Sequence, residues 1–171
     1  MATPITGVNN GDDATDTWPD AVTTELNRQQ DVALTADVSK AASSWSDVTG
    51  LSVPVVSGKR YRIRLTATWQ NGSTGGVRIG FDFPTGSSNF RGLMTYTGET
   101  APDALVHEWH TTTDDGAGVT SVDVSSTPRF ARFDGRYRCG TTGTLKVRYY
   151  RNGAGTTTIE DGSFLEVLAD S

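Results

Sequence analysis

The chain has 171 residues with 20 acidic and 15 basic side chains, and its net charge of −5 argues against nucleic acid as the main partner, because phosphate binding needs a basic surface. A domain of this length buries roughly 70% of its unfolded surface, so it can hold a core without a metal or a disulfide. The single Cys139 excludes a disulfide framework and a Cys-based metal site, and we expect it to be a small core residue.

The first residues, "MATPITGVNN", have neither a basic region nor an apolar stretch, so we expect no secretory signal. Apolar runs such as "LSVPVV" are far shorter than the ~20 residues of a membrane span. These features predict a protein that is made in a cytoplasm and has no membrane partner.

The acidic charge is concentrated in the first part of the chain. Residues 1–50 hold eight acidic and two basic side chains, whereas residues 51–171 hold twelve acidic and thirteen basic ones. We call residues 1–30 the leader and predict that it is a docking arm, ordered only by a partner, followed by a β-domain over residues 31–171.

The leader contains one short segment with helical character. Trp18 precedes Pro19, which suits a first helical position, and Val22 and Leu26 then fall on one side of a helix. A helix this short is marginal in water, so it must pack on its own β-domain, on a sister subunit or on another protein. We expect Trp18, Pro19, Val22 and Leu26 to be the docking residues.

After the leader, side chains alternate as in β-strands. "KRYRIRLTATW" places five apolar residues on one face, and "GVRIGFDF" repeats the pattern. Turn signals such as "QNGSTGG" and "RNGAG" separate eight to ten candidate strands. This spacing predicts an all-β fold, an antiparallel β-sandwich of jelly-roll type, with no helix after residue 40.

No segment supports catalysis or metal binding. His107 and His110 resemble a zinc motif, but in a strand they point to opposite faces and cannot bind one ion. Asp114 and Asp115 before Gly116 fit a hairpin turn better than a calcium loop. No Gly-x-Ser-x-Gly elbow is present. We therefore expect no enzyme activity, no cofactor and no metal.

Most aromatic residues fall on the apolar face of their strands, which predicts that they lie in the core. This set includes Tyr61, Trp69, Phe81, Phe83, Phe130, Phe133, Tyr137, Tyr149 and Phe164. Trp45, Tyr96 and Trp109 are open to a second interpretation, because exposed aromatics on a sandwich can bind a host glycan. Arginines on the polar faces, among them Arg62, Arg64 and Arg148, either pair with local carboxylates or meet the acidic leader of a neighbouring subunit.

Three segments together suggest a family. "WPDAVTTELNRQQD" resembles an N-terminal segment of virion proteins of tailed bacteriophages, "WSDVTGLSVPVVSGKRYRIRLTATW" is similar to their β-sandwich modules, and "GTTTIEDGSFLEVLADS" is similar to their terminal strand. The resemblance implies a non-enzymatic structural protein located in the virion. It further implies a homotrimeric capsid decoration protein, or minor capsid protein, whose N-terminal arm reaches the major capsid protein. A tail protein that binds a host glycan or receptor is the alternative.

Overall fold

The computed structural model describes residues 29–72, 75–85, 89–97, 105–110, 121–123 and 128–170, and all regular structure in them is β-strand. The predicted docking residues Trp18, Pro19, Val22 and Leu26 lie outside these ranges, as does the predicted leader helix. The first strand begins at Gln29, two residues before the predicted start of the β-domain at residue 31. Within the described ranges, no helix has the length and hydrophobicity of a membrane span.

The described residues form two antiparallel sheets. Their strands are β1 (Gln29–Ala33), β2 (Val38–Lys40), β3 (Trp45–Val55), β4 (Arg60–Asn71), β5 (Gly75–Asp82), β6 (Asn89–Thr97), β7 (Leu105–His110), β8 (Ser121–Asp123), β9 (Arg129–Arg138), β10 (Gly143–Gly153), β11 (Thr157–Ile159) and β12 (Phe164–Ala169).

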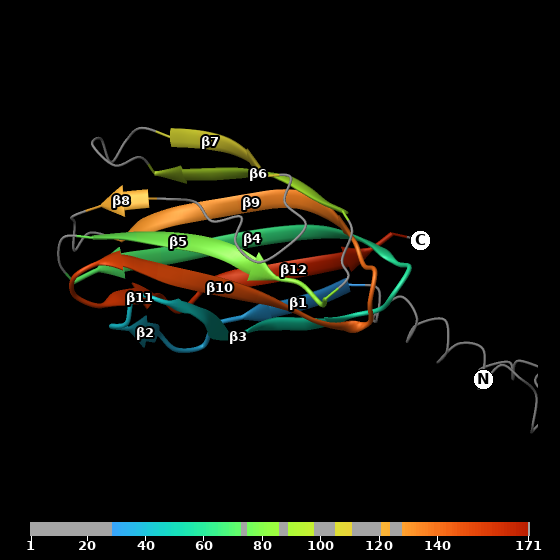
Figure 1. Cartoon of the computed structure of the whole chain (residues 1–171), viewed down its shortest axis with the longest axis horizontal. Helices are drawn as coiled ribbons and strands as arrows, with labels where there is room; N and C mark the ends of the chain where they lie inside the picture. The colour runs from blue at the N-terminus through green and yellow to red at the C-terminus, as the bar shows by residue number, and fades with distance from the viewer. Residues whose placement is uncertain are drawn as a thin grey trace, which may run out of the picture.

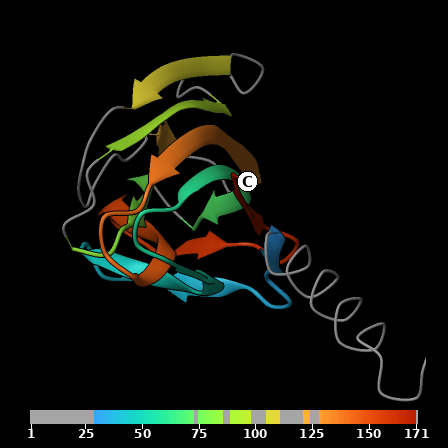
Figure 2. The ribbon, with the colours of Figure 1, turned by 90° about the vertical axis from the view of Figure 1, so that its right-hand side faces the viewer.

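The large sheet has eight strands (Figure 1). Six of them follow the order β1-β12-β4-β9-β6-β7, while β11 pairs with β4 and β2 pairs with β11. The small sheet has the order β3-β10-β5-β8. Viewed from the end, the large sheet passes from yellow β7 at the top, through orange β9, to blue β1 at the lower right (Figure 2). The two-sheet, all-β architecture predicted from the alternation is confirmed, and the jelly-roll winding stays a prediction.

The alternation in β4 shows how the sequence builds these layers. Tyr61, Ile63, Leu65, Ala67 and Trp69 are all buried, while the residues between them are exposed or half-buried. Successive strand residues point to opposite faces, so one face of the large sheet packs on the small sheet and the other faces away from it.

Aromatic rings fill one part of the core between the sheets. Phe133 is fully buried and stacks on Phe90 with ring centroids 4.9 Å apart, and it meets Phe81 edge-on at 5.0 Å. Phe83 adds contacts to Phe90 at 4.7 Å and to Tyr137 at 4.6 Å. Tilted and edge-on pairs at these separations stabilise beyond the area that they bury.

Two residues predicted for the core lie elsewhere. Phe130 is 37% exposed and Phe164 is 41% exposed. Phe130 lies three positions before the buried Phe133 in β9, so the two rings must point to opposite faces of the sheet. Phe164 precedes the buried Leu165 in β12 and is likewise directed outward.

Two further predictions from the sequence are confirmed. Cys139 is 1% exposed, and its Sγ lies 3.0 Å from the carbonyl oxygen of Thr141, to which it donates. The segment with His107 and His110 is strand β7.

Strand β3 contains the main irregularity of the small sheet. Its pairing with β10 shifts register between Lys146 and Arg148. Gly50 lies in the shifted part of β3 with φ at +101°, a conformation that other residues rarely adopt. A side chain at this position would also approach Leu34, whose Cδ2 lies 3.0 Å from an added Cβ.

Candidate interaction surface

The outward face of the large sheet is the strongest candidate for a functional surface. Four of the five large apolar residues that are exposed among the described residues lie on it: Leu105, Trp109, Phe130 and Phe164. The inward face of the same sheet is buried against the small sheet. A sheet with one buried face normally carries polar side chains on the other, so exposed apolar side chains there indicate contact with another surface.

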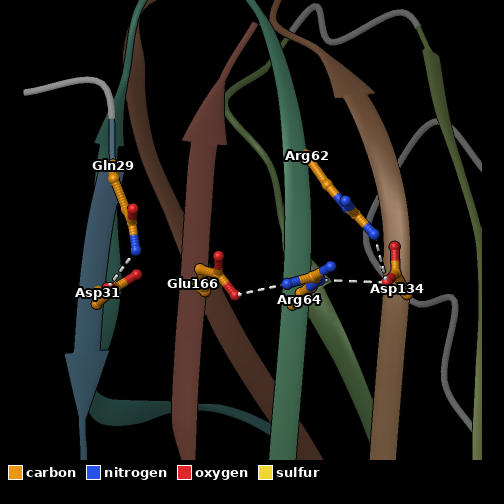
Figure 3. Close-up of polar contacts among 6 residues, drawn as sticks. All are labelled: Gln29, Asp31, Arg62, Arg64, Asp134 and Glu166. Carbon is orange, nitrogen blue, oxygen red and sulfur yellow. Dashed lines mark hydrogen bonds and ion pairs between the residues drawn. The ribbon is translucent and has the colours of Figure 1, made fainter. Parts of the chain in front are cut away.

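A row of charged residues crosses the middle of this outward face. The strand registers place Asp31, Glu166, Arg64 and Asp134 side by side on β1, β12, β4 and β9. Figure 3 shows Arg64 between its two partners, with Nη1 3.4 Å from Glu166 Oε2 and Nε 3.3 Å from Asp134 Oδ2. Arg62 also reaches Asp134 at 3.1 Å.

These contacts determine the ionisation of Asp134. Partial burial alone would raise the pKa of this carboxyl group, but the hydrogen bonds and positive charges of Arg62 and Arg64 outweigh it and hold the pKa below its usual value. The pKa of Arg64 is raised, chiefly by its hydrogen bond to Glu166. Arg64 and Asp134 therefore stay charged at neutral pH, and the ion pairs of Arg64 with Glu166 and Asp134 join β12, β4 and β9.

Five exposed arginines lie next to this row, at one end of the sheet. Arg62 of β4, Arg136 of β9 and Arg91 of β6 are direct cross-strand neighbours, and Arg60 and Arg138 are neighbours in the next row. We call these five residues the arginine array. With Asn89, Tyr137 and Asp170, four of them line a shallow depression of about 290 Å³.

The array is unusual in its charge balance. Like charges directly opposite each other destabilise a sheet. Arg62 pairs with Asp134. Among the described residues, no carboxylate lies within ion-pair distance of Arg60, Arg91, Arg136 or Arg138. The guanidinium groups of these four arginines are therefore candidates for contact with an anionic group.

An apolar zone occupies the side of the face next to the sheet edge at β7. Leu93 lies opposite Trp109, and Leu105 and Phe130 line a shallow hollow of about 390 Å³ together with Leu93, Thr95 and Arg132. We call Leu93, Leu105, Trp109 and Phe130 the Trp109 zone. The Trp109 side chain is 75% exposed, so the ring is available to a partner.

The three aromatic residues considered for surface binding have separate positions. Trp109 is exposed on β7 of the large sheet. Trp45 is half-buried on β3 of the small sheet, where its ring lies 5.7 Å from that of Tyr150. Tyr96 is 5% exposed and belongs to the core, so of its two interpretations the structure supports core packing and contradicts surface binding. Tyr96 shares the inward face of β6 with the buried Met94, two positions away.

The outward face of the small sheet pairs its charges locally. Asp47 binds Lys146 at 2.8 Å and Arg148 at 3.3 Å, and Asp82 lies 3.8 Å from Lys146. Arg78 lies over the Tyr150 ring at 5.6 Å. Local pairing, one of the two alternatives for the arginines, thus holds for Arg62, Arg64 and Arg148. The arginine array and the Trp109 zone were not predicted, because each is assembled from strands that are distant in sequence.

Among the residues that the structure describes, His107 belongs to no cluster of potential metal ligands. Its Nδ1 lies 2.9 Å from Thr95 Oγ1 on the neighbouring strand. Within the described ranges, no three His, Cys, Asp or Glu residues are grouped so that they could hold a metal ion. The polar pair of His107 and Thr95 lies within the Trp109 zone, between the row of Leu93 and Trp109 and the row of Leu105.

Comparisons with known proteins give little beyond this geometry. No protein-family model and no curated protein sequence matches the chain. Three solved structures show some similarity. The Eiger TNF of S. frugiperda is 8% identical over 84% of this chain and 92% of that chain, with a TM-score of 0.38. The tripod from the baseplate of bacteriophage Tuc2009 is 11% identical over 98% of this chain and 75% of that chain (TM-score 0.28), and infectious bursal disease virus Gt strain is 9% identical over 84% of this chain and 37% of that chain (TM-score 0.25). Likenesses at these TM-scores establish neither a shared fold nor a shared function.

Proposed function

We propose that the chain is a non-enzymatic structural protein of a bacteriophage virion, and that it is a trimeric capsid decoration protein. The observation that carries the proposal is the outward face of the large sheet, where Trp109, Leu105 and Phe130 are exposed on a domain whose other sheet face is well packed. Several large apolar side chains that are exposed on one face of a sheet are typical of a protein–protein interface. The resemblance of three sequence segments to phage virion proteins supports the same function.

The leader and the Trp109 zone have different roles in this proposal. The leader attaches the subunit to the major capsid protein, with Trp18 as its main anchor, because large aromatic side chains contribute much of the binding energy of interfaces. The Trp109 zone lies between copies of the chain, where burial of its apolar side chains stabilises the trimer. Three leaders in one trimer then bind the shell with an avidity that a single weak arm lacks.

Virion attachment is tested by removing the leader. A variant that lacks residues 1–26 keeps all of β1 and should give the same far-ultraviolet circular dichroism as the full chain. During infection by the phage that encodes the chain, the full-length protein should co-purify with virions and the truncated protein should not. Equal incorporation of the two would refute the docking role of the leader.

The role of the Trp109 zone is tested by single substitutions. Trp109→Ser should weaken self-association by about 2 kcal/mol, or about thirtyfold in the dissociation constant. Val56→Ser is the matched control, since Val56 is 52% exposed and lies outside this face. Sedimentation velocity over a range of concentrations measures both. A monomeric full-length chain, or equal association of the two variants, would contradict a trimer built on this zone.

A tail protein that binds a host glycan or receptor is the second candidate function. It is favoured by the exposed Trp109 ring beside the polar pair of His107 and Thr95, since a flat aromatic face and adjacent hydrogen-bonding groups suit a sugar ring. A glycan array with the full chain distinguishes the candidates. Binding that Trp109→Ser abolishes would support this alternative, and absence of binding would leave the decoration protein as the proposal.

A further inference from the structure

The arginine array needs a partner that supplies several carboxylates at once. Four of its five members have no acidic neighbour within ion-pair distance among the described residues, and Arg62, Arg136 and Arg91 lie directly opposite one another on adjacent strands. Neighbouring strands are about 4.8 Å apart, so the backbones of these three arginines lie within about 10 Å of one another. Such an array is suited to a chain of carboxylates and fits an apolar partner poorly.

The chain itself contains a segment of the required charge. Residues 1–28 hold five acidic side chains and one basic side chain, which gives −4, whereas residues 29–171 hold fifteen acidic and fourteen basic ones, which gives −1. All five acidic residues fall between positions 12 and 25: Asp12, Asp13, Asp16, Asp20 and Glu25. The leader is thus nearly the whole source of the negative charge of the protein.

The leader also joins the body beside the array. Strand β1 begins at Gln29, which pairs with Leu168 of β12, and Leu168 pairs with Arg62. Gln29 is therefore level with the row of Arg62, Arg136 and Arg91, which ends about 19 Å away across four strand spacings. Asp20 is nine residues before Gln29, and nine extended residues reach about 30 Å. The acidic segment can cover the full width of the array.

We infer that the arginine array binds the acidic leader segment, residues 12–25, of its own chain. Tethering favours the chain's own segment, since a short linker gives an effective concentration of about 1 mM or more before any second copy is present. Binding places carboxylates between the opposed guanidinium groups and offsets their repulsion. The inference concerns the free subunit and does not depend on attachment to a virion.

The test uses the full chain with two introduced cysteines, Thr17→Cys in the leader and Asn89→Cys at the border of the array. Both replaced residues are uncharged, Asn89 is exposed and pairs with Arg138, and the native Cys139 is buried. The rate of disulfide formation between them, normalised to the reaction of each thiol with a small neutral disulfide, reports how often the leader lies on the array. Non-reducing gels distinguish a bond within one chain from a bond between two chains.

Arg138→Glu and Arg132→Glu form a matched pair in this background. Both arginines are exposed on the outward face of β9, but Arg132 lies outside the array and is flanked by Thr66 and Thr95. The within-chain rate should fall about fivefold with Arg138→Glu, because the charge reversal replaces an exposed attraction with a repulsion, and it should change little with Arg132→Glu. A rise in ionic strength to about 0.5 M should produce a similar fall, because the screening length drops below about 5 Å.

Three results would overturn the inference. Equal rates in the Arg138→Glu and Arg132→Glu variants would show that the array does not hold the leader. A rate that is insensitive to salt would show that the association is not electrostatic. A disulfide that forms only between chains would assign the array to the leader of a second copy.

Discussion

Two glycines on the inward face of the large sheet lie where the core leaves no space for a larger side chain. Gly135 of β9 and Gly92 of β6 are cross-strand neighbours, and the ring of Phe133 lies against both. An alanine methyl group at position 135 would lie 2.3 Å from Cζ of Phe133 and 2.6 Å from the carbonyl oxygen of Arg91. Ordinary carbon contacts are about 3.5–4.0 Å, so the ring would have to move by more than about 1 Å.

The ring has little space for that movement. Phe133 is 0% exposed and is held between Phe90 and Phe81. The second obstacle is backbone and cannot rotate away. Gly135→Ala should therefore reduce the free energy of unfolding by about 2 kcal/mol, as other overpacked cores do. For a chain of this size, that loss lowers the melting temperature by roughly 4–8 °C.

Urea unfolding followed by circular dichroism measures the effect. Gly72→Ala is the matched control, since an added methyl group there would lie 3.6 Å from the nearest atom, the carbonyl oxygen of Thr156. Replacing Phe133 by leucine in the Gly135→Ala variant removes the clashing ring atoms and should recover about 1 kcal/mol relative to the sum of the single effects. If Gly135→Ala is as stable as Gly72→Ala, the packing described for Phe133 is wrong.

Three further predictions concern charge, backbone and thiol. Asp134→Asn should cost up to about 1 kcal/mol at pH 7, because its side chain is 41% exposed and its ion pairs are screened. The pKa of Asp134 is lowered by folding, so this stabilisation is present above the unfolded-state pKa of about 3.9 and is lost as the pH falls through the folded-state pKa. The free energies of unfolding of variant and wild type should therefore converge in acid. A difference that stays constant with pH would contradict the pairing. Gly50→Ala should destabilise by about 1–2 kcal/mol in thermal unfolding, since φ is +101°, and an unchanged melting temperature would refute the strain. Cys139 should react with a thiol reagent only after unfolding, as its side chain is buried, and fast reaction of the native protein would show an open core.

The layers of the fold could be predicted from sequence because each long strand alternates strictly. In β4 the apolar positions from Tyr61 to Trp69 keep one phase for nine residues, which leaves a single way to bury them. The same rule shows why the prediction for Phe130 failed. Phe130 and Phe133 are an odd number of positions apart, so only one of them could face the core, and the phase of Ala131 and Tyr137 selects Phe133.

The candidate surface could not be predicted, because it depends on which strands are neighbours. The arginine array combines β4, β9 and β6, and the Trp109 zone combines β9, β6 and β7. In sequence each of these arginines is one polar residue in an alternating strand. Only the pairing order and the register bring Arg62, Arg136 and Arg91 into one row.

The leader shows the opposite case. Its negative charge can be read directly from the residues, and the place where it joins the sheet follows from the first residue of β1, Gln29. The docking roles of Trp18, Pro19, Val22 and Leu26 stay a prediction. They depend on the partner, whose surface is not encoded in this chain.

Hydroxyl-radical footprinting tests most directly whether the outward face of the large sheet is an interface. The free chain, held dilute enough to be monomeric, and the chain in purified virions are oxidised under the same conditions, and modification of each residue is measured by mass spectrometry. We predict that Trp109 and Leu105, at 75% and 53% exposure, are strongly modified in the free chain and protected in the virion, whereas Val56 is modified equally in both. Equal modification of Trp109 in both states would contradict the account.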